Sequence, residues 1–415
     1  MNNLQNPTTM FAGSPFAEPH FTQEFYKPGI QVGTIGHVAH GKSTLVKALT
    51  GIKPTRHSAE KIRGITIHLG YSSCKCYSNA EKTRFAALGS DGPPSFEKDG
   101  ITFYFRRHVS FVDCPGHDQF MAVMMSGAFV MDAVILVVAA NEPCPMPQTE
   151  EHLMVAEMVG LKNMLVVHNK VDLLSRDDCL SHFHTLRRFL DGTLGEDSPI
   201  FPTSACSSSN LEPLIEAIID LPSPSIDLSD DPRMPIVRSF DVNGPSTPMG
   251  SLKGAVLGGT LVSGSLRLGD TIHILPSGLS TRVVSLRAEK ESLEEITPGG
   301  LICVGTTLDP SISGKNRMVG QWIVKDPESL CVVKEALVKM VFLKRTVDKV
   351  KTKVKSGEHL VCHLGSLTLN ATFERSKSKS VYRVTFDRPV VFDPSMRLIP
   401  TRRGRVLGFG KKIEE

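Results

Sequence analysis

Residues 36–44 read GHVAHGKST and place glycine, lysine and serine at the spacing of a phosphate-binding loop. The pattern consists of Gly36, Gly41, Lys42 and Ser43. In such a loop the backbone N–H groups and the start of a helix surround an anion, and the lysine reaches the outer phosphates. A lysine-bearing turn before a surface helix is the alternative interpretation. We expect the nucleotide phosphates to be lined by Ala39, His40, Gly41, Lys42, Ser43 and Thr44.

The segment DCPGH, residues 113–117, offers groups for a metal ion and a terminal phosphate. Asp113 ends an apolar run and can hold Mg²⁺ through a water molecule, while the N–H of Gly116 can contact the terminal phosphate. His117 is then expected near the attacking water, as the catalytic residue. A D-x-x-G motif is common, so by itself it is weak evidence for a nucleotide site. The other motifs in the same chain strengthen this interpretation.

The segment NKVD, residues 169–172, predicts which base is bound. The carboxylate of Asp172 can accept hydrogen bonds from N1–H and the 2-amino group of guanine. Adenine offers no donor at that place, so an ATP site gains nothing from this carboxylate. We therefore assign Asn169, Lys170 and Asp172 to a guanine nucleotide, GTP or GDP.

Two shorter segments complete the predicted site. In TSAC, residues 203–206, the backbone N–H of Ala205 is expected to bond the guanine O6, with Ser204 and Cys206 beside it. In RGIT, residues 63–66, the Thr66 hydroxyl can join that of Ser43 on Mg²⁺, and its N–H can contact the γ-phosphate. A loop held in this way is ordered with GTP and released with GDP.

The elements that position these motifs alternate between apolar runs and helical patterns from Gly29 to Leu221. The apolar runs are 109–112, 133–138 and 164–167. This alternation predicts an α/β fold whose mostly parallel sheet has helices on both faces, with the site at the strand ends. The first domain is therefore a P-loop nucleotide-binding domain.

The remaining chain has a different pattern. After a Pro/Ser/Asp-rich linker at 223–232, apolar residues alternate with glycine turns, which is typical of β-barrels. We predict a nucleotide-binding domain at 28–222, a second domain, a β-barrel, at 233–330 and a third domain, another barrel, at 331–415. Residues 1–27 are expected to form a disordered arm.

Composition limits the class of protein further. The 415 residues contain nine cysteines at irregular spacing, no apolar run long enough for a membrane span and no basic leader, which predicts a cytoplasmic protein without membrane contact. The net charge is +4, yet residues 331–415 hold 19 Lys plus Arg against 8 Asp plus Glu, a balance of +11. This basic end could contact phosphate backbones or simply be solvated.

The set GHVAHGKS, RGIT, DCPGH, NKVD and SAC resembles the translational GTPases. Longer segments, among them DPRMPIVRSFDVN, LKGAVLGG and NRMVGQ, are similar to the gamma subunits of translation initiation factor 2, and this likeness extends from Gly29 to the C-terminus. The alanine at position 39, where most relatives have aspartate, is similar to the eukaryotic form. The resemblance also implies that Val38 and Ile65 form an apolar gate that keeps His117 from the water.

The function that this resemblance implies is GTP-dependent delivery of initiator methionyl-tRNA to the small ribosomal subunit, with release after hydrolysis. The implied partners are the alpha and beta subunits of a heterotrimer, a GTPase-activating protein and a guanine-exchange factor. An elongation-type or selenocysteine-specific tRNA carrier is the alternative within the same fold. A metabolic phosphotransferase and a scaffold with a vestigial nucleotide site belong to other classes, and NKVD counts against the first.

A zinc site is not expected. Family members commonly carry four cysteines between the switch threonine and DCPGH, whereas only Cys74 and Cys76 occur here. Two thiols cannot close a structural zinc site by themselves.

Overall fold

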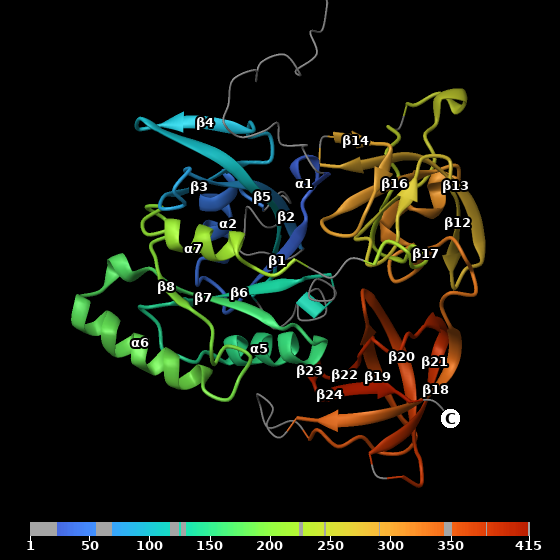
Figure 1. The fold of residues 1–415 in the computed structure, drawn as a ribbon. Coiled ribbons are helices and arrows are strands. Elements are labelled where there is room, and N and C mark those ends of the chain that lie inside the picture. Colours follow the sequence, from blue (N-terminus) through green and yellow to red (C-terminus); the bar gives the residue numbers. More distant parts are fainter. Residues whose placement is uncertain are drawn as a thin grey trace, which may run out of the picture.

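The computed structural model describes residues 23–54, 69–116, 124–125, 130–223, 227–244, 246–289, 291–343, 351–378 and 380–413. Its strands form one eight-stranded sheet, two seven-stranded sheets and a separate two-stranded pair. Figure 1 shows an α/β unit, coloured blue to green, followed by two β-barrels in yellow-orange and red. The predicted fold class is therefore confirmed, whereas the domain boundaries given above stay predictions.

The α/β unit begins with a short helix and ends with helix α7. Its elements are α1 (Gln23–Tyr26), β1 (Ile30–Ile35), α2 (Lys42–Thr50), β2 (Gly70–Ser78), β3 (Phe85–Gly89), β4 (Ser95–Lys98), β5 (Ile101–Asp113), β6 (Ala133–Ala139), α5 (Pro147–Val159), β7 (Asn163–Asn169), η3 (Val171–Leu173), α6 (Arg176–Leu190), β8 (Ile200–Pro202) and α7 (Glu212–Ile219).

The sheet of this unit has the order β3-β2-β5-β1-β6-β7-β8, with β4 paired to β5. The five strands from β5 to β8 in that order are parallel, and β2, β3 and β4 add antiparallel partners. The carboxyl ends of parallel strands meet at one edge of a sheet. The loops that follow β1, β5, β6, β7 and β8 therefore come together there.

Strand β6 shows why helices cover both faces of the sheet. All of its residues are buried, so its sequence reads as a continuous apolar run. Ala133, Ile135 and Val137 join the core with helices α2 and α7, whereas the residues between them pack on the opposite side with α5 and α6. Successive side chains of a strand point to opposite faces, which produces this division.

The second unit is a closed barrel of β12, β17, β9, β10, β16 and β13, in which the pairing of β12 with β13 completes the ring. Its core includes Met234, Ile272 and Val304, all fully buried. The bounds are β9 (Met234–Phe240), η4 (Met249–Ser251), β10 (Val256–Gly259), β11 (Leu266–Arg267), β12 (Thr271–Leu275), β13 (Leu279–Ala288), β14 (Glu291–Leu293), β15 (Glu295–Ile296), β16 (Ile302–Thr306), η5 (Pro310–Ile312), η6 (Gly314–Asn316) and β17 (Trp322–Val324).

The third unit closes in the same way, since β19 pairs with β22 to complete the ring β19-β20-β21-β18-β24-β22. Phe373, Phe386 and Phe392 fill its interior. The bounds are β18 (Val332–Phe342), β19 (Glu358–Leu364), β20 (Leu367–Arg375), β21 (Val381–Val391), β22 (Leu398–Arg402), β23 (Arg405–Val406) and β24 (Gly408–Lys412).

Both barrels contact the α/β unit. The third barrel packs Ile399 and Val406 into the same core as α5, and Arg405 Nη1 donates to both carboxylate oxygens of Glu151 at 3.1 and 3.2 Å. The second barrel receives Lys27, whose Nζ donates to the carbonyl oxygens of Pro298 and Gly299 at 2.9 and 3.0 Å. Helix α5 therefore lies between the sheet and the third barrel (Figure 1). No helix among the described residues has the length and apolar character that crossing a bilayer requires.

Candidate nucleotide-binding site

The predicted phosphate loop connects β1 to α2 at the carboxyl edge of the sheet. Its backbone needs left-handed conformations at Gly36 (φ 131°), Ala39 (φ 62°) and Gly41 (φ 97°). A Cβ atom on Gly36 would lie 2.4 Å from the carbonyl oxygen of Val137, and one on Gly41 would lie 2.3 Å from Asn169 Nδ2. Glycine is therefore required at both positions by close neighbours as well as by conformation.

Lys42 lies at the start of α2, and its ammonium group points back into the loop. Its Nζ donates to the carbonyl oxygens of Gly36 at 2.9 Å and His37 at 2.6 Å. The side chain is only 6% exposed, and this burial lowers the pKa of Lys42 to about 8, although Asp113 acts in the opposite direction. Carbonyl oxygens of the loop are the acceptors of this buried ammonium group. A bound phosphate oxygen can therefore replace one of these carbonyls as the acceptor.

Two hydroxyl groups surround the carboxylate of Asp113. Ser43 Oγ donates to Oδ2 of Asp113 at 2.5 Å, and Thr34 Oγ1 donates to Oδ1 at 3.0 Å. The arrangement follows from strand pairing, because Thr34 on β1 is the register partner of Asp113 on β5. A carboxylate and a hydroxyl at this spacing are hard oxygen donors of the kind that suits Mg²⁺.

Gly116 brings the end of the D-x-x-G segment against the phosphate loop. A Cβ atom there would lie 2.5 Å from Lys42 Nζ and 2.8 Å from the backbone nitrogen of Val38. Only glycine fits between these groups. His117 of the same segment, and Arg63, Ile65 and Thr66 of the other switch segment, lie outside the described residues.

Asn169 connects the loops that hold the two ends of a nucleotide. Its Nδ2 donates to the carbonyl oxygen of His40 at 2.9 Å, and its Oδ1 accepts from the N–H of Ala205 at 3.0 Å. All three residues are buried. The sequence assigns the backbone N–H of Ala205 to the guanine O6. In the structure this N–H donates to Asn169, so a guanine O6 would have to share it with Asn169.

The other residues assigned to the base lie around Asn169. Lys170 has a left-handed backbone (φ 62°) and precedes the 3₁₀ turn η3, which carries Asp172 with its side chain exposed at the surface. Ser204 is buried and Cys206 is exposed. An exposed carboxylate beside these turns is accessible to a base arriving from solvent.

His152 on α5 contacts the phosphate loop, and sequence reasoning did not identify this residue. Its Nδ1 accepts the N–H of Gly36 at 3.0 Å, at the first residue of the phosphate loop. The ring is fully buried, and burial lowers the pKa of His152 to about 3, which keeps it neutral and able to accept. Thr34, which bonds Asp113, and Glu142, whose carboxylate lies 3.2 Å from Nε2 of His40 in the phosphate loop, were missed as well. The only available signal was their position at or just after the carboxyl ends of strands β1 and β6.

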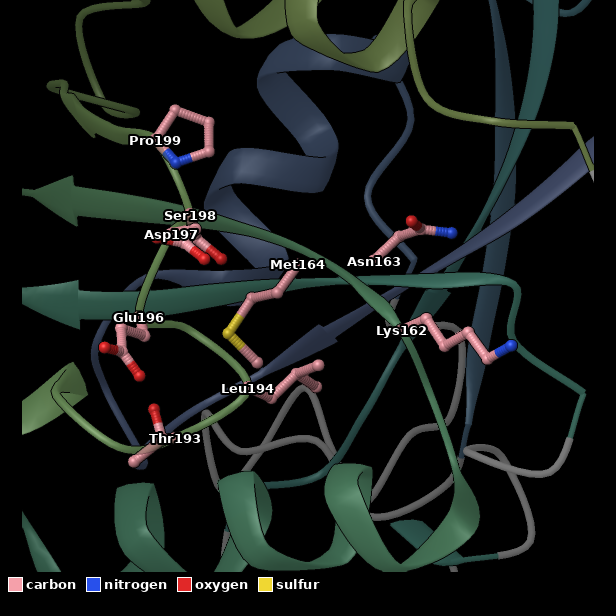
Figure 2. A pocket seen from close by; sticks show the side chains of 9 residues that line it. All are labelled: Lys162, Asn163, Met164, Thr193, Leu194, Glu196, Asp197, Ser198 and Pro199. Atoms are coloured by element: carbon pink, nitrogen blue, oxygen red, sulfur yellow. The ribbon is translucent and has the colours of Figure 1, made fainter.

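A shallow pocket elsewhere on the α/β unit is unrelated to these loops. Figure 2 shows it at the start of β7 and the approach to β8, lined among others by Lys162, Glu196 and Asp197. That is the amino edge of the parallel strands, opposite the loops described above. It does not belong to the nucleotide site.

The described residues hold no group of three or more His, Cys, Asp and Glu side chains arranged to bind a metal ion. Cys74 and Cys76 are buried neighbours on β2 with their Sγ atoms 3.8 Å apart. The prediction that no zinc binds stays a prediction.

Comparison with known families agrees with this geometry. Residues 27–224 match the elongation factor Tu GTP binding domain. Together with the two closed barrels, this match defines the class as a translational GTPase, an enzyme that hydrolyses GTP.

The relatives specify the family. Eukaryotic translation initiation factor 2 subunit gamma from Encephalitozoon cuniculi (strain GB-M1) is 43% identical over 371 residues, covering 85% of this chain and 84% of the relative. Translation initiation factor 2 subunit gamma from Sulfurisphaera tokodaii (strain DSM 16993) is 39% identical over 92% of this chain and 98% of its own. The chain belongs to the gamma-subunit family of translation initiation factor 2 and is a GTP-binding initiation factor.

A solved structure shares the fold. The bacterial selenocysteine-specific elongation factor EF-Sec has a TM-score of 0.72 and 24% identity, covering 93% of this chain and 58% of that chain. This likeness concerns the fold alone. Because the sequence relatives are initiation factors, the alternative of an elongation-type carrier is not favoured.

Proposed function

We propose that this GTPase is the core of a cytoplasmic heterotrimer with alpha and beta subunits, and that it delivers initiator methionyl-tRNA to the small ribosomal subunit. The tRNA binds the GTP form and is released after hydrolysis. An activating protein stimulates hydrolysis, and a guanine-exchange factor replaces GDP. The proposal is supported by the family and by the convergence of the phosphate and base loops at one sheet edge through Asn169.

In the proposed site the phosphates lie in the loop from Ala39 to Thr44, and Lys42 exchanges a loop carbonyl for a phosphate oxygen. Gly116 approaches the terminal phosphate, where its N–H reports the presence of that group. Asp172 selects guanine, with Lys170 and the segment from Ser204 to Cys206 beside the base. The phosphate roles are supported by the hydrogen bonds of Lys42 to the loop carbonyls and by the space beside Lys42 Nζ that only a glycine at position 116 leaves open.

The proposed metal is Mg²⁺, which would neutralise charge on the outer phosphates when bound. Ser43 and Thr66 would hold it through their hydroxyls and Asp113 through water. The oxygen-rich contact between Ser43 and Asp113 supports this assignment. Val38 and Ile65 are proposed to form the apolar gate before His117, the proposed catalytic residue.

Guanine selection by Asp172 tests the proposed site most directly. Asp172→Asn is expected to shift the preference from guanine toward xanthine nucleotides, because the amide donates where xanthine presents an oxygen. The measurement is a competition titration with GDP and xanthosine diphosphate, using Asp177→Asn in the first turn of α6 as the matched control. Unchanged GDP preference in Asp172→Asn would remove this residue from the site.

The tRNA function needs a separate measurement. We expect initiator methionyl-tRNA to bind the GTP form of the complex more tightly than the GDP form, and more tightly than elongator tRNA binds. Equal affinities for the two tRNAs would contradict the proposed role in initiation.

A further inference from the structure

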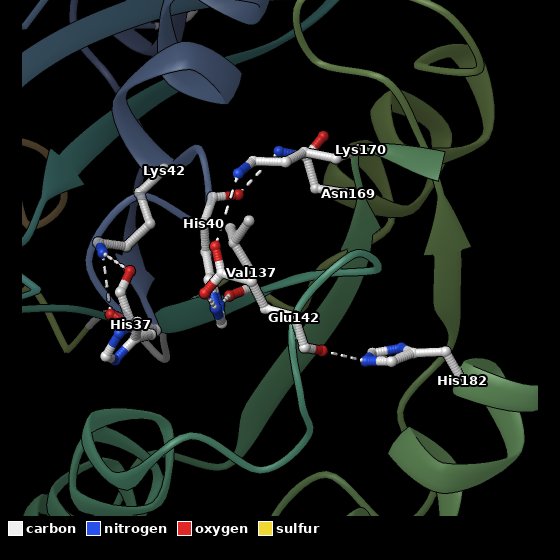
Figure 3. A network of polar contacts seen from close by, with 9 residues as sticks. His37, His40, Lys42, Val137, Glu142, Asn169, Lys170 and His182 are labelled. Carbon is white, nitrogen blue, oxygen red and sulfur yellow. Dashed lines mark hydrogen bonds and ion pairs between the residues drawn. The ribbon is translucent and has the colours of Figure 1, made fainter. Parts of the chain in front are cut away.

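Glu142 lies in the loop after β6, and its carboxylate contacts both loops of the nucleotide site (Figure 3). Oε2 is 3.2 Å from Nε2 of His40 in the phosphate loop, and Oε1 is 3.8 Å from Nζ of Lys170 in the base segment. Neither the spacing of the motifs nor the family match assigns a role to this residue. One side chain thus touches both ends of the site.

The contact with His40 is partly buried, since the His40 side chain is enclosed whereas that of Glu142 is 28% exposed. His40 is fully buried, and its Nδ1 is 3.2 Å from the carbonyl oxygen of Val137. Burial lowers the pKa of His40 to about 4, against the opposite effect of Glu142, and a ring with a single hydrogen can donate it to only one of its two acceptors, the carboxylate or the carbonyl. We assign that hydrogen to Nε2, because a carboxylate is a stronger acceptor than a carbonyl.

The contact with Lys170 is more open, since both side chains are 28% exposed. An ion pair of this kind contributes less than the shorter, partly buried bond to His40. The loop of Glu142 is itself fixed, because its backbone carbonyl accepts a hydrogen bond from His182 Nε2 on α6 at 2.8 Å. The carboxylate is therefore held in place between the two loops.

We propose that Glu142 is a positioning residue that fixes the distance between the phosphate loop and the base loop, and thereby slows release of guanine nucleotide. It acts through the His40 side chain, whereas Asn169 acts on the His40 backbone, so the two links are separate. A molecule that pulls Glu142 away from His40 and Lys170 would loosen the phosphate loop and the base loop together. This inference rests on the proposed nucleotide site.

The test is the rate of GDP release from the full chain, measured by displacement of fluorescent GDP. Glu142→Ala loses both contacts and is expected to release GDP about tenfold faster. Glu142→Gln keeps an acceptor for His40 and loses only the charge near Lys170, so about a threefold increase is expected. The matched controls are Glu150→Ala and Glu150→Gln, at an exposed carboxylate in the first turn of α5.

Hydrogen exchange on the GDP-bound protein distinguishes positioning from general destabilisation. In Glu142→Ala the amides of 39–43 and 169–173 should exchange faster, while those of the two barrels stay unchanged. Release rates within about twofold of the unmodified protein, or faster exchange throughout the chain, would overturn the inference. Failure of the unmodified protein to bind GDP would instead overturn the nucleotide site itself.

Discussion

Replacing Asn169 with alanine removes the side chain that joins the phosphate loop to the base loops. The carbonyl of His40 and the N–H of Ala205, bonded to it at 2.9 and 3.0 Å, lose their partner in a buried environment. Each neutral hydrogen bond contributes about 1 kcal/mol net, so the two bonds together contribute about 2 kcal/mol. If nucleotide binding requires the loops to be held as these two bonds hold them, binding must supply the lost free energy in the variant. The affinity for GDP should then fall about 30-fold.

The assay is equilibrium binding of fluorescent GDP to the full chain at fixed Mg²⁺. Asn163→Ala, at the opposite end of the same strand β7, is the matched control and should bind as the unmodified protein does. Asn169→Asp is a second probe, because its carboxylate can still accept from Ala205 but cannot donate to His40. We expect its affinity to fall as well, since a negative charge then faces the His40 carbonyl.

Two results would refute this reasoning. GDP binding by Asn169→Ala within about twofold of the unmodified protein would show that the link between the loops does not matter for binding. An equal loss in Asn163→Ala would show that the effect comes from β7 as a whole rather than from the loop contacts.

Two further predictions concern Lys42 and His117. Burial holds the pKa of Lys42 at about 8, below its ordinary 10.5, so the folded protein binds fewer protons than the unfolded chain between these values and stability should rise with pH in that window. Lys42→Met should abolish this rise in stability with pH and weaken GDP binding; a rise of the same size in the variant would contradict the assignment. His117→Ala should leave GTP and tRNA binding nearly intact and reduce stimulated single-turnover hydrolysis about 100-fold in an assembled initiation complex; undiminished stimulation would exclude a catalytic role.

Much of the site could be predicted because its chemistry is local in sequence. The loop from Gly36 to Ser43 needs fixed glycines and a lysine at fixed spacing, and NKVD needs a carboxylate just after a strand. The continuous apolar run of β6 likewise predicted a strand buried on both faces, which the two cores on either side of it confirm. In each case the physical requirement falls on neighbouring residues.

Other features depended on which segments the fold brings together. The sequence alone determined the α/β unit with its guanine motifs and the barrel character of the rest, because periodicity and turn residues are local properties. The contacts of Glu142 with His40, of His152 with Gly36 and of Arg405 with Glu151 join residues 102, 116 and 254 positions apart. No spacing rule links residues so far apart, so only the parallel strand order and the packing of the third barrel on α5 could decide these contacts.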